Sequence, residues 1–286
     1  MANIREEFFL LKNIQSPYLN ENVIRSLLMY VNNFRNALEL TQNMEKECQN
    51  TALLNTLCQR IIDGEPYQYV LNSSMFCGFD FYVDKRVLIP RNETEELTQN
   101  IINLVKEKCM DQPTIIDVCT GSGCIAISLA NLIRDSNVYG GDISPEAIEV
   151  ANNNNIRLNS NVDFRCGNLL EPFAGIKADV IVSNPPYIGL NDLVDEQVKT
   201  YEPSLALFIE PKHFFYEEIF RVAPNYLKEH YIMAFEISED MGERLIELAI
   251  KYFPKSDISV SKDMYGKDRF LYIIKWCKIL KLLLMF

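Results

Sequence analysis

The sequence predicts an α/β fold in which a mostly parallel sheet is covered by helices on both faces and ends with an antiparallel strand. Three observations lead to this prediction. From Thr114 onward, short apolar stretches alternate with helical stretches, which is typical of a covered parallel sheet. The last two apolar stretches flank a polar turn, which indicates a closing hairpin. Before residue 73 the apolar periodicity is helical, so a small helical domain precedes the sheet.

The composition is ordinary for a folded protein in a reducing compartment. A chain of 286 residues suffices for one large or two modest domains. The formal net charge of -11 opposes phosphate neutralisation, so we expect no stable nucleic-acid binding. The eight cysteines form no Cys-x-x-Cys pair and only two histidines accompany them. We therefore expect reduced thiols and no metal site.

Neither end of the sequence predicts a membrane protein. The first residues are too charged for a signal peptide. The apolar run at 279–286 is far shorter than the ~20 residues of a membrane span. We therefore expect a cytoplasmic protein without membrane contact, and the role of the apolar run stays open.

Residues 1–72 are predicted to form a helical domain, and residues 73–90 a β-hairpin linker. One helical stripe ends in Asp63-Gly64, a stop signal. Another is made of Ile24, Leu27, Leu28, Val31, Phe34 and Leu38. In the linker, Phe79, Phe81 and Val83 alternate with polar residues, as in a strand.

Residues 91–286 are predicted to form the catalytic domain. Its first helix is expected to begin with a capping box made by Asn92 and Glu95. The expected strands are 114–118, 137–142, 162–166, 179–183 and 231–237. The expected helices are 123–134, 145–158, 213–227 and 240–252. The closing hairpin is expected from 258–260 and 270–274.

A glycine turn follows the first strand of this domain. Gly121 and Gly123 permit a tight turn and close approach of a ligand to the backbone, next to the N–H groups of a helix start. Asp117, at the strand end, either orients this loop or receives a cationic ligand group. A dinucleotide-binding domain begins in the same way. The cofactor-binding residues expected here are Asp117, Cys119, Thr120, Gly121, Ser122 and Gly123.

The next two strands end in residues that suit an adenosine-containing cofactor. The carboxylate of Asp142 can accept both ribose hydroxyls. Ser144-Pro145 behind it is a plausible N-cap and first helical residue, which alone would explain the local sequence. After the third strand, an adenine ring could pack on Leu169 with its amine near Asn168. These residues lie at carboxyl ends of successive strands, where open α/β sheets bind ligands.

The fourth strand ends in Asn184-Pro185-Pro186-Tyr187. An amide carbonyl followed by two residues without N–H groups makes a rigid wall of hydrogen-bond acceptors beside an aromatic ring. Such a wall suits a planar NH2 group, since an acceptor can take each proton while the lone pair stays free to attack. The plain alternative is a loop that ends the strand, because proline cannot continue a central ladder.

With these motifs the chain resembles the N5-glutamine methyltransferases that modify peptide chain release factors, the HemK/PrmC family, over about residues 60 to 275. Asn-Pro-Pro-Tyr also occurs in adenine-N6 DNA methyltransferases, and Ile89-Pro90-Arg91 with Glu93-Thr94-Glu95 favours the glutamine enzymes. The other matching segments are Gly64-Glu65-Pro66, Phe76-Cys77-Gly78, Asp117 to Gly123, Asp142, and Glu202-Pro203 with Ala206-Leu207.

The resemblance implies a class I S-adenosylmethionine-dependent methyltransferase fold (Rossmann-like), with S-adenosylmethionine as methyl donor. The implied acceptor is the glutamine of the Gly-Gly-Gln loop of class 1 release factors, docked by the N-terminal helices. The expected catalytic residues are Asn184, Pro185 and Tyr187. Pro186 and Arg91 are expected to join them in substrate binding, and Asn184 also to face the cofactor.

The chain departs from the family pattern at four places. Cys119 replaces a glycine, Asn92 a proline, Asn168 a common acid, and residues 208–213 a Gly-Gly-x-Asp-Gly stretch. The changes at Cys119 and Asn168 bear on cofactor affinity, and the last bears on the substrate side. Two alternatives therefore stay open: an adenine-N6 nucleic-acid methyltransferase, and a cofactor-binding module that has lost activity.

Overall fold

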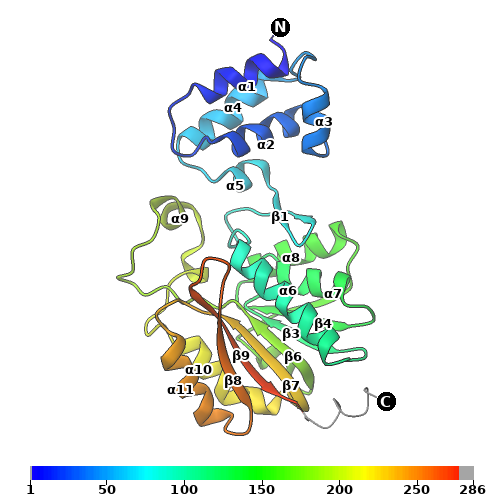
Figure 1. The fold of residues 1–286 in the computed structure, drawn as a ribbon, viewed down its shortest axis with the longest axis vertical. Helices are drawn as coiled ribbons and strands as arrows, with labels where there is room; N and C mark the ends of the chain where they lie inside the picture. The colour runs from blue at the N-terminus through cyan, green and yellow to red at the C-terminus, as the bar shows by residue number, and fades with distance from the viewer. Residues whose placement is uncertain (1, 277–286) are drawn as a thin grey trace. The chain divides into compact units, whose positions relative to one another are not determined.

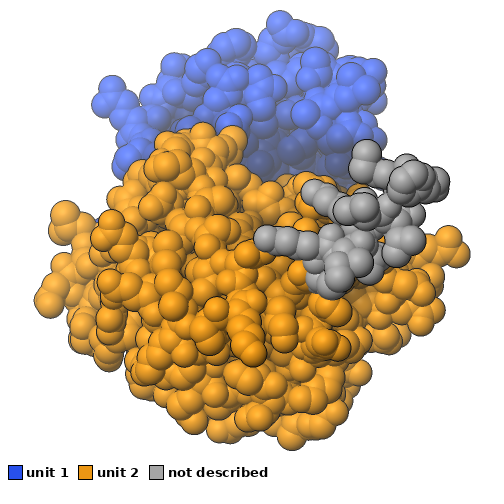
Figure 2. Space-filling view, turned by 60° about the horizontal axis from the view of Figure 1, so that its bottom comes forward, with its two compact units in different colours: residues 1–73, 195–201 blue, residues 74–194, 202–286 orange. Residues whose placement is uncertain are grey.

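The computed structural model describes residues 2–276 (Figure 1). The chain divides into two compact units, coloured separately in Figure 2. The first contains the residues up to Ser73 and the later segment Asp195–Tyr201. The second contains Ser74–Val194 and the chain from Glu202 onward. The apolar run at 279–286 lies outside the described residues.

The first unit is helical and has its own core. Its helices are α1 (Ile4–Lys12), α2 (Glu21–Val31), α3 (Ala37–Gln42), α4 (Thr51–Ile62), α5 (Tyr67–Leu71) and α9 (Glu196–Tyr201). Asparagine side chains cap the starts of α1 to α4, because each accepts a backbone N–H of the first turn. From α9, the Gln197 side chain donates to the Gly64 carbonyl and the Tyr201 hydroxyl donates to the Asp63 carbonyl. The chain thus returns to the first unit after most of the sheet is complete.

The predicted apolar stripe from Ile24 to Leu38 is wrong beyond Val31, where α2 ends. The Asn32 side chain donates to the Leu28 carbonyl at 2.8 Å, and so shares this acceptor of the last helical turn with the Asn32 N–H, which donates to it at 3.3 Å. Asn33 then adopts a φ of 56°, in the left-handed region that stops helices. Leu38 falls on the separate helix α3 and is 65% exposed.

The second unit contains a seven-stranded sheet in the order β5-β4-β3-β6-β7-β9-β8 (Figure 1). All neighbours from β5 to β7 are parallel, and β9 is antiparallel to both β7 and β8. The predicted mostly parallel sheet with a terminal antiparallel strand is confirmed. The strands are β3 (Thr114–Val118), β4 (Asn137–Asp142), β5 (Val162–Cys166), β6 (Ala178–Ser183), β7 (Leu227–Glu236), β8 (Asp257–Lys262) and β9 (Asp268–Lys275).

Helices cover both faces of the sheet, because successive side chains of a strand point to opposite faces. Ile116 and Phe235 belong to the core under α10 (Phe214–Val222) and α11 (Gly242–Tyr252). Ile115 and Ala234, one residue away, belong to the opposite core. That core lies under α6 (Asn92–Glu107) and α7 (Cys124–Leu132), and also holds the hairpin of β1 (Ser74–Phe76) and β2 (Phe79–Phe81). Helix α8 (Pro145–Arg157) packs on β4 and β5.

Two predicted helix ends differ in the structure. The capping box at Asn92 is wrong, because Asn92 is already the first residue of α6 and Arg91 is its N-cap without a side-chain cap bond. Acidic residues in the first turn, including Glu95, still favour this helix start. Helix α10 ends at Val222, earlier than predicted, and a 3-10 turn containing Pro224 follows it.

The strand order places a topological switch point beside β3. From β3 the chain builds β4 and β5 on one side, and it then crosses to β6 on the other side. Because crossover helices diverge at such a point, a crevice opens at the carboxyl ends of the strands. The glycine turn after β3 and the Asn-Pro-Pro-Tyr segment after β6 both begin at this edge.

Candidate functional site

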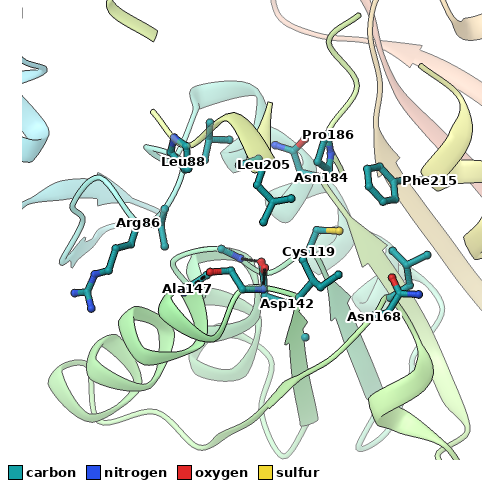
Figure 3. A pocket seen from close by; sticks show the side chains of 18 residues that line it. Arg86, Leu88, Cys119, Asp142, Ala147, Asn168, Asn184, Pro186, Leu205 and Phe215 are labelled. Carbon is teal, nitrogen blue, oxygen red and sulfur yellow. Dashed lines mark hydrogen bonds between the residues drawn. The ribbon is translucent and has the colours of Figure 1, made fainter. Parts of the chain in front are cut away.

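A pocket of the second unit lies at this switch point (Figure 3). Six of the ten residues expected to bind the cofactor line it: Cys119, Gly121, Asp142, Asn168, Leu169 and Asn184. Pro186 also lines it. The other four, Asp117, Thr120, Ser122 and Gly123, are not among the residues that line it.

Asp117 is fully buried and holds the glycine turn from beneath. Its Oδ2 accepts the Thr120 hydroxyl at 2.6 Å and the Ala126 N–H at 3.2 Å. Burial, together with the negative charge of Asp142, raises the pKa of Asp117 to about 7, and these two hydrogen bonds oppose the rise. The sequence left two roles open for Asp117, orienting the loop or receiving a cationic ligand group. Its contacts within the described residues support the first role.

The turn itself uses backbone conformations that favour glycine. Gly121 has a φ of 54° and Gly123 a φ of 80°. A Cβ at Gly123 would lie 2.9 Å from the Phe164 ring, whereas one at Gly121 would meet no atom within 4 Å. Cys119, in place of the family's usual glycine, has a φ of 62° and therefore carries left-handed strain. The turn thus offers its backbone to the pocket at Gly121 and packs tightly at Gly123.

Asp142 ends β4 and keeps two acceptor positions for a ligand. Its Oδ2 accepts the Gly121 N–H at 2.9 Å, and its Oδ1 accepts the Ser144 N–H at 3.0 Å. Each carboxylate oxygen has two lone pairs, so each retains one after these bonds. Burial raises the pKa of this carboxyl, and the backbone N–H groups oppose the rise. Ser144 caps α8 through the Ala147 N–H and Pro145 follows it, as predicted.

Asn168 and Leu169 form another part of the wall. Asn168 is exposed, and its NH2 group donates to Glu171 at 3.4 Å, which leaves Oδ1 as the acceptor for a ligand amine. Leu169 is partly buried, and its apolar side chain offers a surface to a flat ring. The change from the common acid to Asn168 therefore retains an acceptor and removes a charge.

Asn184 enters the pocket from the end of β6, with its amide nitrogen already engaged. Its Nδ2 donates to the Thr94 hydroxyl at 3.0 Å. The Tyr187 hydroxyl donates to Glu236 at 2.9 Å, and burial together with the Glu236 charge raises the pKa of Tyr187 well above its usual value. Pro185 is buried, and neither it nor Tyr187 lines the described pocket. Of the four residues Asn184-Pro185-Pro186-Tyr187, only Asn184 and Pro186 therefore line this pocket.

Arg91 lies outside the pocket lining and pairs with a buried acid. Its guanidinium donates to Glu202 at 2.5 Å, and the Ile89 N–H donates to the other carboxylate oxygen at 3.1 Å. This pair fixes the chain just before Pro203 and Leu205, which line the pocket. Arg91 is thus placed to position one wall of the pocket.

Several functional candidates were missed by the sequence reasoning. Leu205 is 57% exposed and points into the space between Asn184 and Asp142 (Figure 3). Phe215, from α10, lines the pocket on the side of Asn184. Glu236 is buried at the end of β7. A charged residue that ends a strongly apolar strand is a signal that could have found Glu236, whereas nothing local distinguishes Leu205 or Phe215.

Comparisons with known proteins match the chain to methyltransferases. A family model described as a methyltransferase domain matches residues 111–259. The release factor glutamine methyltransferase of Bacillus anthracis is 38% identical over 245 residues, which cover 83% of this chain and 87% of that protein. The chain belongs to the release factor glutamine methyltransferase family. Its relative in Bacillus subtilis (strain 168), of the same name, is 39% identical over 214 residues, 72% of this chain and 74% of that one.

The fold of this family member is that of class I methyltransferases, as predicted. A solved structure of a T. thermophilus 16S rRNA methyltransferase, in complex with AdoMet and guanosine, matches with a TM-score of 0.52 and 13% identity. The match covers 71% of this chain and 50% of that one. As an enzyme of this family, the chain is a methyltransferase whose chemistry depends on S-adenosylmethionine.

The remaining predictions concern metals and membranes. Within residues 2–276, no group of three or more His, Cys, Asp or Glu side chains is arranged to hold a metal ion. No helix in the same part of the chain is long and apolar enough to cross a membrane.

Proposed function

We propose that this chain methylates the side-chain amide nitrogen (N5) of the glutamine in the Gly-Gly-Gln loop of class 1 peptide chain release factors, in the cytoplasm, and so modulates translation termination. The observation that carries the proposal is the position of Asn184. Its amide lines the same pocket as the glycine turn and Asp142, with its nitrogen committed to Thr94. The amide oxygen is then the end that meets an acceptor NH2 group.

The pocket residues fit S-adenosylmethionine. The remaining lone pairs of Asp142 suit the two ribose hydroxyls, and Oδ1 of Asn168 suits the exocyclic amine of adenine. Space around Gly121 allows a ligand to approach the backbone. Apolar surface for the rings is supplied by Leu169 and by the exposed side chain of Ile143. When bound, the cofactor supplies an electrophilic methyl group on a sulfonium centre.

The chain's own contribution to catalysis is positioning. An amide nitrogen is a poor nucleophile, because its lone pair is delocalised into the carbonyl group. In our proposal, Oδ1 of Asn184 and the carbonyl of Pro185 each accept one N–H of the substrate amide, while Tyr187 packs beside it. Two acceptors fix the plane of the NH2 group and favour localisation of its lone pair. After transfer the nitrogen must lose one of its two protons; because an N-protonated amide is strongly acidic, water can take this proton, and no titrating base is required.

The N-terminal unit is proposed to dock the release factor. This part of the proposal is supported by the family relationship and by the separate core of that unit. The family pattern is lost at residues 208–213. The chain there is hydrogen-bonded to Ile188, the residue after Asn184-Pro185-Pro186-Tyr187: the Ile188 N–H donates to the Leu207 carbonyl, and the Ile209 N–H donates to the Ile188 carbonyl. We therefore expect the loop at 208–213 to lie on the substrate side.

One assay tests the proposal against its alternatives. Methyl transfer from radiolabelled S-adenosylmethionine is measured to a class 1 release factor, to the same factor with its loop glutamine changed to alanine, and to adenine-containing DNA and RNA. We expect labelling only of the release factor that retains its loop glutamine. Transfer to nucleic acid would instead support an adenine methyltransferase, and cofactor binding without transfer to any acceptor would support an inactive module.

The Asn184→Ala variant tests the site itself. It removes the side-chain acceptor, so transfer should fall below detection while the dissociation constant for S-adenosylmethionine changes little. Near-normal turnover of this variant would refute the role given to Asn184.

A further inference from the structure

A chain of hydrogen bonds runs from the catalytic amide to a buried acid on another strand. Nδ2 of Asn184 donates to Oγ1 of Thr94 at 3.0 Å, and Oγ1 of Thr94 donates to Oε2 of Glu236 at 2.6 Å. Thr94 is 3% exposed and Glu236 1% exposed, so water does not compete for these groups. The three residues come from the ends of β6 and β7 and from the first turn of α6.

The direction of this chain follows from the chemistry of its last member. An ionised carboxylate only accepts hydrogen bonds, so Glu236 commits the single hydroxyl proton of Thr94 to itself. The hydroxyl oxygen of Thr94 can then only accept, and its partner must be the NH2 end of Asn184. The two ends of an amide have nearly the same shape, so packing alone does not choose between them. Glu236 makes that choice through Thr94.

The opposite arrangement would defeat the site. If Thr94 were free to donate, it could hold Oδ1 of Asn184 and turn the NH2 end toward the pocket. An NH2 group there would face the NH2 group of the substrate amide, donor against donor. The correct orientation of Asn184 is therefore a requirement of the proposed transfer and not only a detail of packing.

Two hydroxyl donors favour the ionised, accepting state of Glu236, against the burial that raises its pKa. The Tyr187 hydroxyl donates to Oε1 at 2.9 Å, so both carboxylate oxygens have donors. Burial raises the pKa of Glu236, and the nearby charge of Glu93 adds to the rise. The hydroxyls of Thr94 and Tyr187 and the positive charge of Arg269 oppose it. The donors that Glu236 orients are thus among the groups that favour its charge.

We infer that Thr94 and Glu236 are positioning residues, which present the oxygen of Asn184 to the acceptor amide by fixing the direction of their shared hydrogen bonds. The inference rests on the proposed function, because it concerns an acceptor that arrives with an NH2 group. Neither residue needs to touch the substrate.

Variants at Thr94 separate this role from packing. Thr94→Val keeps the shape and removes the hydroxyl, whereas Thr94→Ser keeps the hydroxyl and removes a methyl group. We expect kcat for release factor methylation to fall at least tenfold in Thr94→Val and to stay within threefold in Thr94→Ser, with KM for S-adenosylmethionine little changed in both. A packing role predicts the reverse order of the two variants, which would overturn the inference.

Thr98→Val is the matched control for this pair. Thr98 is also fully buried on α6, one turn further on, and its hydroxyl donates to the Thr94 carbonyl outside the chain of bonds described here. It should leave kcat unchanged. Thermal unfolding and cofactor binding are measured for every variant, so that a loss of folded protein is not taken for a loss of positioning.

Variants at Glu236 test the direction of the bonds. Glu236→Met removes the acceptor, and kcat should again fall at least tenfold. Glu236→Gln can still accept from Thr94 through its amide oxygen and donate to Tyr187, so it should recover most of kcat. An equal loss in Gln and Met variants would show that charge and not acceptance matters, and would overturn the inference.

The proposed function can fail separately. Absence of transfer by the unsubstituted chain would remove the proposed function and this inference together. Normal transfer by the unsubstituted chain with unchanged kcat in Thr94→Val would remove the inference alone.

Discussion

Asp117→Asn should make the stability of the second unit less dependent on pH. Asp117 is fully buried, its Oδ1 has no hydrogen-bond partner within the described residues, and its Oδ2 accepts from Thr120 and Ala126. Burial raises its pKa to about 7 in the folded protein, from an ordinary value of 3.8. An asparagine at this position can accept the same two bonds and cannot ionise.

The direction of the effect follows from proton linkage. The unfolded chain releases the Asp117 proton near pH 4, whereas the folded chain retains it until about pH 7. The contribution of this group to the free energy of unfolding is therefore fully present below about pH 4 and decreases as the pH rises to about 7. Above pH 7 the free energy of unfolding no longer changes with the pH through this group. The full difference corresponds to about 4 kcal/mol, of which about 2.5 kcal/mol falls between pH 5 and pH 8.

The assay is urea unfolding of the cofactor-free protein at pH 5, 6, 7 and 8. The sequence has one tryptophan, Trp276, directly after β9, so its fluorescence follows the second unit. The free energy of unfolding of Asp117→Asn, relative to the unsubstituted chain, should rise by about 2.5 kcal/mol from pH 5 to pH 8. Asp163→Asn, on the exposed face of β5, controls for the amide substitution. A difference that stays constant with pH would refute the reasoning.

Three further predictions concern the pocket and its walls. Gly123→Ala should lower the free energy of unfolding by about 3 kcal/mol, because its Cβ would lie 2.9 Å from a ring carbon of Phe164. Gly121→Ala has no such contact and should lower it by about 1 kcal/mol; equal losses of the two variants in urea unfolding would contradict this prediction. Arg91→Met leaves the buried carboxylate of Glu202 without its cation and should cost about 3 kcal/mol, measured in the same way, and the double variant with Glu202→Gln should recover part of the loss. Asp142→Asn should weaken S-adenosylmethionine binding at least tenfold in calorimetry, since an NH2 group would replace one acceptor oxygen; unchanged affinity would exclude Asp142 from the ribose site.

The sheet was predictable because its signals are local. Central strands such as β3 and β6 are short apolar stretches with a polar residue at or next to the carboxyl end, Asp117 and Ser183, so type and boundary are both readable. The parallel arrangement then brings those ends to one edge, which is why seven predicted site residues share a pocket. The helical unit was less predictable, since asparagines such as Asn33 interrupt an otherwise continuous apolar period.

The supporting contacts of the site were not predictable, because they join distant parts of the chain. Thr94 and Glu236 are 142 residues apart in the sequence, and Arg91 and Glu202 are 111 apart. Nothing in the local pattern of either pair indicates its partner. The place of α9 in the helical unit likewise depends on contacts across more than 130 residues, such as that between Gln197 and Gly64.

The acids at the carboxyl edge of the sheet differ in what they control, because they differ in their donors. Burial raises the pKa of Asp117, Asp142 and Glu236 alike. Backbone N–H groups bind Asp117 and Asp142, in the first case together with a threonine of the same loop, so these acids fix the course of the glycine turn. Glu236 is bound by the hydroxyls of Thr94 and Tyr187, and Thr94 in turn binds the amide of Asn184. Changes at the first two acids should therefore appear in cofactor affinity, and changes at Glu236 in turnover.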